Sequence, residues 1–291
     1  SSFFTRFFPE SFHESSRRQF FSPNLYLSLF GLSSGIASLG LIQALKGPSI
    51  KKIAITLPKL PNDLRGLKIA QISDLHVGPT IRKEYVEKVV HLTNQENPDL
   101  IFITGDLVDA KSFSIHDLIE PLKNLKAKYG VFYVTGNHEY YWEAESLLKE
   151  IKKLGITPLL NENKILSINN ALVLIAGVTD PMGEKTLPYH KPDIKQARKS
   201  DIETNLNILL SHRPETCFEA EPLGFDLQFS GHTHAGQFFP FNIFVSLAHR
   251  YYQGLNRHQK MWVYVNPGTG YWGPANRFAV PSEISLITLY S

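Results

Sequence analysis

The chain has 291 residues, of which 43% are hydrophobic and 20% are charged, and this balance excludes a disordered, collagen-like or coiled-coil protein. Its net charge of +3 is uneven, because residues 1–52 carry +4 and residues 53–291 carry −1. A body this close to neutrality gives no indication of nucleic-acid binding. The single cysteine, Cys217, excludes an intramolecular disulfide, and we expect it to be an inert buried side chain.

An uncharged, largely apolar segment occupies residues 19–45, which is long enough to span a bilayer as a helix. The pair Arg17-Arg18 precedes it, and together they resemble a twin-arginine export signal. We therefore predict a leader or anchor over residues 1–45. It would attach the protein to the membrane, specifically the inner membrane, with the exported face favoured over the cytoplasmic one. A plain signal anchor and a buried helix of a small subdomain are the alternatives.

Three prolines, Pro48, Pro58 and Pro61, interrupt residues 46–65, which we predict to be a linker. The remainder, residues 66–291, has a length compatible with one large domain.

The body alternates strand and helix patterns. Short apolar runs rich in β-branched and aromatic residues predict strands at residues 67–73, 100–104, 131–135, 172–175, 207–210, 227–229, 262–265 and 284–289. Apolar residues at helical spacing predict helices over residues 85–93 and 147–154. This alternation favours a layered α/β fold with a largely parallel sheet in its first half, and from about residue 225 a second, more antiparallel sheet.

Polar residues follow five of the predicted strands, and these are Asp74 and His76, Asp106 and Asp109, Asn137 and His138, His212, and His232 and His234. In open α/β sheets, ligands bind beyond the carboxyl ends of the strands. A loop Asp alone is usually a turn former, and a lone His is usually structural. Oxygen and imidazole donors without cysteine suit Mn, Fe or Zn, and their number exceeds the need of one tetrahedral ion. The whole set therefore predicts a site for two divalent metal ions.

In this order the motifs resemble the calcineurin-like metallophosphoesterase family over residues 66–290. The resemblance implies a four-layer α/β/β/α sandwich of two mixed sheets. It also implies a ligand set, in which Asp74, His76 and His234 hold one metal, Asn137, His212 and His232 hold the second, and Asp106 bridges both. His138 would be the catalytic residue beside the leaving group, and Asp109 would orient a ligand or the neighbouring histidine.

Such a site implies hydrolysis of phosphodiester, pyrophosphate or phosphomonoester bonds by a metal-bridged hydroxide. Ala110-Lys111 stands where protein Ser/Thr phosphatases of the superfamily have Arg-Gly, which counts against that branch. The segments 67–76, 232–237 and 268–274 are most similar to the YkuE/YaeI-like membrane-linked or twin-arginine-exported bacterial phosphoesterases. Ala235 departs from the Gly more usual in that group, and we expect little effect of this change.

The expected partner is a small-molecule or lipid-linked phosphoester, with the membrane engaged through the N-terminal segment and no nucleic acid. One alternative is a pyrophosphohydrolase acting on UDP-2,3-diacylglucosamine in lipid A synthesis, as in a related branch. Another is a non-catalytic, membrane-anchored metal-binding scaffold. The aromatic run 238–247 bears on this choice, because it is either a flap that receives acyl chains or part of the core. We expect it to pack on the second sheet, since buried aromatic residues are the commoner case.

Overall fold

The computed structural model describes residues 23–291, apart from the side chains of residues 112–114. Helix α2 (Pro23–Lys46) has 24 residues and contains an 18-residue stretch with a mean hydropathy of 1.7, so its length and composition suffice to cross a membrane. This confirms the predicted N-terminal apolar helix. The Arg17-Arg18 pair lies outside the described residues. A compact unit begins within this helix, at Gly40, and contains the rest of the chain.

Two six-stranded sheets form the body of that unit. The first has the order β1-β12-β2-β3-β4-β5, with β1 (Ser49–Thr56), β12 (Glu283–Tyr290), β2 (Lys68–Ile72), β3 (Leu100–Thr104), β4 (Val131–Val134) and β5 (Thr157–Pro158). The second has the order β10-β11-β9-β8-β7-β6, with β10 (Gly254–His258), β11 (Met261–Val265), β9 (Leu227–Ser230), β8 (Leu206–Leu210), β7 (Ala171–Gly177) and β6 (Glu162–Ile168). Both sheets mix parallel and antiparallel neighbours.

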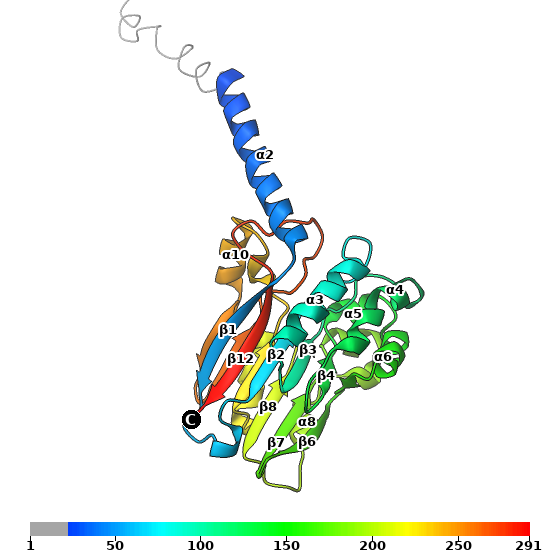
Figure 1. Cartoon of the computed structure of the whole chain (residues 1–291), viewed down its shortest axis with the longest axis vertical. Coiled ribbons are helices and arrows are strands. Elements are labelled where there is room, and N and C mark those ends of the chain that lie inside the picture. The colour runs from blue at the N-terminus through cyan, green and yellow to red at the C-terminus, as the bar shows by residue number, and fades with distance from the viewer. Residues whose placement is uncertain (1–22) are drawn as a thin grey trace, which may run out of the picture. The chain divides into compact units, whose positions relative to one another are not determined.

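Helices lie between the strands in the chain. They are α3 (Lys83–Gln95), α4 (Ser112–Ile119), α5 (Asn137–Tyr141), α6 (Ala144–Lys153), α7 (Met182–Thr186), α8 (Ile194–Arg198), α9 (Cys217–Ala220) and α10 (Phe241–Ala248). Figure 1 shows α3, α4 and α6 beside the first sheet.

Three apolar clusters define the layers. One joins the first sheet to α3, α4 and α6, a second lies between the sheets, and a third joins the second sheet to α8 and α9. Successive residues of β2 show why: Ile69 belongs to the cluster between the sheets, and Ala70 belongs to the cluster under the helices. Strands that are apolar on both faces must be covered on both faces. The predicted α/β/β/α sandwich is therefore confirmed, and Cys217 is buried as expected.

The structure differs from the predicted linker over residues 46–65. Residues 49–56 form strand β1, which pairs in parallel with β12 at the edge of the first sheet (Figure 1). Lys51 and Lys52, both exposed, interrupt the apolar run of this strand, as is usual for an edge strand, so the sequence lacks a clear strand pattern here.

The second sheet also differs from the expectation. It begins with β6 rather than near residue 225, and three of its five strand pairs (β11·β9, β9·β8 and β8·β7) are parallel. Short helices α8 and α9 carry the crossovers that parallel pairing needs. They were missed because four or five residues give too little helical periodicity to detect.

Candidate metal centre

The predicted site residues follow β2, β3, β4, β8 and β9, where Asn137 and His138 begin helix α5 and the others lie in the connecting segments. Backbone hydrogen bonds tie these segments to one another: Asp74 donates to the carbonyl of Gly105 at 3.0 Å, and Gly231 donates to that of His212 at 3.0 Å. Residues far apart in the chain thus meet at one end of the sandwich. Most of their side chains are buried, so their positions are fixed by packing.

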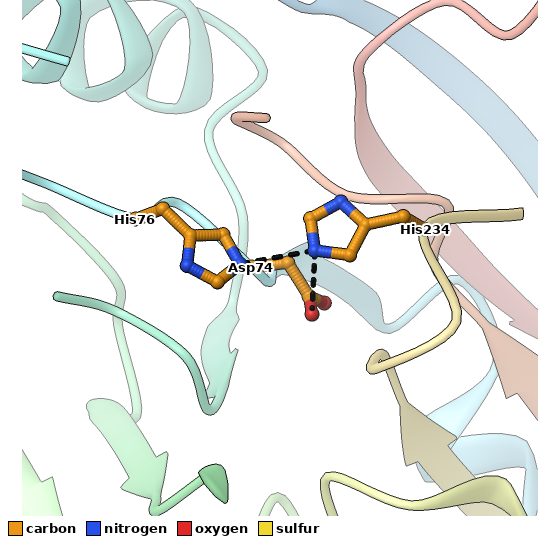
Figure 2. A group of neighbouring side chains, drawn as sticks. All are labelled: Asp74, His76 and His234. Carbon is orange, nitrogen blue, oxygen red and sulfur yellow. Dashed lines mark hydrogen bonds and ion pairs between the residues drawn. The ribbon is translucent and has the colours of Figure 1, made fainter. Parts of the chain in front are cut away.

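One group consists of Asp74, His76 and His234 (Figure 2). The Nε2 atoms of the two histidines lie 3.0 Å apart, and His234 Nε2 lies 3.4 Å from Asp74 Oδ1. Figure 2 shows the three side chains pointing toward a common centre, Asp74 and His76 from the segment after β2 and His234 from the segment after β9. Two nitrogens and one oxygen converging in this way can hold a divalent ion.

A second group consists of Asp106, His212 and His232. His212 Nε2 lies 3.2 Å from Asp106 Oδ2 and 3.3 Å from His232 Nδ1. The same Asp106 oxygen lies 3.9 Å from His76 Nε2, so this carboxylate faces both groups. It stands where a ligand shared by two ions would stand.

His138 and Asp109 form a pair beside this centre. His138 Nδ1 lies 3.0 Å from Asp109 Oδ1, and its Nε2 lies 3.9 Å from Asp106 Oδ2. The backbone N–H of His138 donates to Asp106 Oδ1 at 2.9 Å. The Asp109 carboxylate thus holds Nδ1 of the His138 ring, while Nε2 of the same ring faces the candidate metal centre.

The electrostatics of the centre favour bound cations. Burial lowers the pKa of His76 to about 3 and that of His232 to about 2, and it lowers the pKa of His234 well below its ordinary value. These imidazoles are therefore neutral at physiological pH, which is the form that binds metal. Burial also raises the pKa of Asp74 to about 6, and the charge of His212 offsets this rise only in part.

Asp106 behaves differently because of its neighbour. Burial alone would raise the pKa of Asp106, but the charge of His212 and its hydrogen bond hold that pKa well below the usual range. Burial alone would lower the pKa of His212, and Asp106 outweighs it and raises that pKa to about 10. A carboxylate that stays ionised in a buried site is suited to bridging two cations.

An unpartnered buried atom supports the same interpretation. Asn137 is almost wholly buried, and its Oδ1 has no hydrogen-bond partner among the residues that the structure describes. A buried amide oxygen without a partner costs free energy unless something coordinates it. The donor chemistry around it, imidazole and carboxylate, fits a divalent ion of the Mn, Fe or Zn type.

The backbone of the site is strained. Asp74, His76, Asp106, His232 and His234 all have φ between 49° and 72°, which is the left-handed region that non-glycine residues rarely occupy. Each such residue costs on the order of 1–3 kcal/mol, and such residues cluster at functional sites. The surrounding packing therefore holds these five residues in a backbone conformation that they would rarely adopt on their own.

Two functional residues were not assigned a role from the sequence. Glu139 is buried, and its carboxylate accepts hydrogen bonds from the backbone N–H groups of Asp106 at 3.0 Å and Leu107 at 2.7 Å. It therefore fixes the segment that carries Asp106. Its place three residues after Gly136 matched a helix-capping pattern, which was the available signal.

Arg277 is the second. It is fully buried, donates to the carbonyl oxygens of Pro267 at 2.8 Å and Gly270 at 3.0 Å, and lies 3.2 Å from His234 Nδ1. Burial lowers its pKa to about 10. Nothing in its local sequence distinguishes it from a surface arginine, because its partners are backbone carbonyls.

Comparison with known proteins agrees with this geometry. The model of the calcineurin-like phosphoesterase family matches residues 67–236, and the chain belongs to that family. It is 38% identical over 276 residues to an uncharacterized metallophosphoesterase of Helicobacter pylori, with 94% of this chain and 71% of the relative covered. The chain is thus a hydrolase of phosphoric esters, and the scaffold alternative is set aside.

Two further relatives concern membrane attachment and the predicted YkuE-like subgroup. A zebrafish transmembrane protein with a metallophosphoesterase domain is 34% identical over 267 residues, covering 89% of this chain and 61% of the relative. The metallophosphoesterase YkuE of Bacillus subtilis is 28% identical over 286 residues, covering 95% and 98%. The predicted likeness to the YkuE-like group is confirmed.

Proposed function

We propose that the protein is a two-metal phosphoesterase that hydrolyses phosphodiester or phosphomonoester bonds. One ion would be held by Asp74, His76 and His234, the second by Asn137, His212 and His232, and Asp106 would bridge them. The observation that carries this proposal is the meeting of both ligand groups at the Asp106 carboxylate. Two bound divalent ions would neutralise the phosphoryl oxygens and activate a water for in-line attack.

His138 would act on the leaving group. Its Nε2 faces the centre, and Asp109 holds its Nδ1 and keeps the ring oriented. Burial alone would lower the pKa of His138, but its hydrogen bond to the Asp109 carboxylate and the charge of Asp106 raise it. A protonated imidazole can donate its Nε2 proton to the departing oxygen, which then leaves as an alcohol.

His138→Ala is expected to lower turnover by about 10²-fold, in line with the usual contribution of a general acid. Metal content should stay unchanged, because His138 lies outside both proposed ligand sets. The measurement is kcat for an alkyl phosphoester, whose alkoxide leaving group needs a proton, beside metal analysis of the same sample. His116→Ala, which removes an exposed imidazole, is the matched control. Unchanged turnover in His138→Ala would remove this residue from the mechanism.

Gly231→Ala is expected to weaken metal binding. A Cβ at Gly231 would overlap Asp74 Oδ2 and Ser73 Oγ, so the Asp74 carboxylate would have to move. We expect the Mn concentration for half-maximal activity to rise by roughly tenfold or more, since displaced ligands lose geometry that the metal requires. Gly224→Ala is the control, since no atom lies near its Cβ, although its positive φ adds strain. Equal Mn dependence of Gly231→Ala and the unmodified protein would contradict the close packing.

The proposal itself is tested on the full chain purified in detergent. Hydrolysis of bis(p-nitrophenyl) phosphate and of p-nitrophenyl phosphate is compared with and without Mn, Fe or Zn. Metal-dependent release of p-nitrophenol supports the proposal and shows which bond is preferred. The absence of turnover of both esters with every metal would contradict it.

Membrane attachment is part of the same proposal. Helix α2 is long and apolar enough to act as the anchor, and one relative is named as a transmembrane protein. The Arg17-Arg18 pair supports export of the body through the twin-arginine route. Protease digestion of the body in intact spheroplasts of a bacterial host tests the side: digestion supports export, and protection indicates the cytoplasmic face.

A further inference from the structure

Helix α10, together with Phe239 before it, is an exposed apolar element. Residues 235–248 contain no charge, and none of the residues of α10 is buried. Phe244 is 64% exposed and Leu247 is 81% exposed, and Phe239, Phe241 and Ile243 are each about half exposed. The expected packing of this run on the second sheet is therefore wrong. A patch of this kind on a folded surface marks an interaction site.

The other side of α10 faces the candidate metal centre. A cavity of about 410 Å³ is lined by the proposed metal ligands His232 and His234 and by apolar side chains, among them Phe238, Phe241, Val245, Trp272 and Pro274. Phe241 and Val245 are four residues apart and so share one face of α10. The same helix thus presents one apolar face to the cavity and another to the outside.

The cavity has the wrong chemistry for a polyanion. No Lys or Arg lies among the described residues that line it. His249, one lining residue, is already paired with Glu215 at 2.7 Å. A nucleotide or nucleic acid would need donors and cations along its length, whereas apolar walls suit a hydrocarbon chain.

Contacts connect the segment just before α10 with the last turns of the apolar helix α2. Gly40, where the compact unit begins, accepts a hydrogen bond from the backbone of Arg277 at 3.0 Å, and the side chain of Asn276 lies against it. The carbonyl of Phe278, which follows Arg277 in the chain, accepts a hydrogen bond from the backbone N–H of Phe239 at 3.0 Å. Gln237, just before α10, donates to the carbonyl of Trp272 at 2.7 Å.

These contacts matter because the chain before Gly40 is the proposed membrane anchor. If that helix is in a bilayer, Gly40 and the loop that touches it lie at the bilayer surface. The loop carries Trp272 and Pro274, which line the cavity. Its backbone is also hydrogen-bonded to Phe239, just before the α10 residues that line the cavity. The mouth of the cavity is therefore held close to the membrane.

We propose that the substrate is a membrane lipid that carries a phosphoester. The outer face of α10, with Ile243, Phe244 and Leu247, enters the interfacial layer of the bilayer, as short apolar elements of peripheral enzymes do. The lipid chain lies in the cavity between α10 and Trp272, and its phosphoester reaches the metal centre beyond His232 and His234. This inference rests on the proposed phosphoesterase function and gives that function a substrate class.

The test uses two p-nitrophenyl phosphodiesters that differ only in their second alcohol, methyl or hexadecyl. The full chain is reconstituted with Mn in phosphatidylcholine vesicles, where the hexadecyl ester is embedded and the methyl ester is dissolved. We expect kcat/KM for the hexadecyl ester to exceed that for the methyl ester by roughly tenfold or more, given the apolar area that a long chain buries.

The double variant Phe244→Asp/Leu247→Asp is expected to lose that preference. Neither side chain lines the cavity, so methyl ester turnover should stay within about twofold, which also shows that the variant is folded. Ile202→Asp is the matched control, because Ile202 is an exposed apolar residue in the segment between α8 and β8, before the amino end of β8. It should keep the full preference.

The outcomes separate the two claims. Failure to hydrolyse either diester, with p-nitrophenyl phosphate also left intact with every metal, overturns the proposed function, and this inference with it. Turnover of p-nitrophenyl phosphate alone overturns this inference and leaves the proposed function standing. Methyl ester turnover without a hexadecyl preference overturns the lipid substrate alone. A preference that survives the double variant overturns the role of α10, and an accompanying change from oligomer to monomer would assign its exposed face to a second copy of the chain.

Discussion

Replacing Asp106 by Asn is expected to reduce turnover of a phosphodiester by about 10³-fold, because the carboxylate that we propose as the ligand of both ions would supply several kcal/mol of transition-state stabilisation. Metal content should fall from about two ions per chain toward one, since an amide offers one good oxygen where the carboxylate offers two. The measurement is kcat for bis(p-nitrophenyl) phosphate together with elemental analysis of the purified protein.

The substitution should leave the fold intact. Asp106 has φ of 49°, and Asn is among the few residues that tolerate this conformation, so the backbone need not change. Asp201→Asn, at an exposed position, is the matched control for the chemical change. Turnover of Asp106→Asn within about tenfold of the unmodified protein would show that this carboxylate does not bridge two catalytic ions.

Removal of metal by a chelator is expected to abolish turnover and to lower Tm by about 5–10 °C, as follows when ligands that bind only the native state are withdrawn from a domain of this size. The reason is electrostatic. Without metal, burial disfavours the charge of Asp74, and His212 is the main cation left to balance the buried carboxylates of Asp74 and Asp106. Differential scanning fluorimetry and the turnover assay, run on the same samples, measure both effects.

Adding Mn back should restore Tm and turnover together. In Asp106→Asn the chelator should shift Tm by less, because less metal is bound at the start. A chelated protein with unchanged Tm and full activity would contradict a structural and catalytic role for metal at this centre.

Much of the fold could be predicted because its strands are short apolar runs that end in Gly, Asp or His. The strands after which Asp74, Asp106 and His232 follow were all located correctly. Parallel strands bring such loops to one edge, so the meeting of distant motifs follows from the topology. The pairing of Asp109 with His138 was likewise anticipated as an orienting contact.

Other features depend on tertiary context that local patterns do not contain. Lys51 and Lys52 obscure the apolar pattern of the edge strand β1. The sequence around Arg277 does not indicate that its side chain is buried among backbone carbonyls. The run over α10 has the composition of a core segment, and its exposure can be seen only in the folded chain. Ala235 is a smaller example, because its φ of 49° makes the absence of the usual Gly a source of strain of about 1–2 kcal/mol.

The most direct test of the two-metal centre is a crystallographic one. Crystals of the chain grown with Mn would be measured at a wavelength where Mn scatters anomalously. We predict two anomalous peaks about 3.5–4 Å apart, the separation usual for such pairs. One should lie among Asp74, His76 and His234, the other among Asn137, His212 and His232, with Asp106 between them. A single peak, or none at these residues, would contradict the two-metal centre.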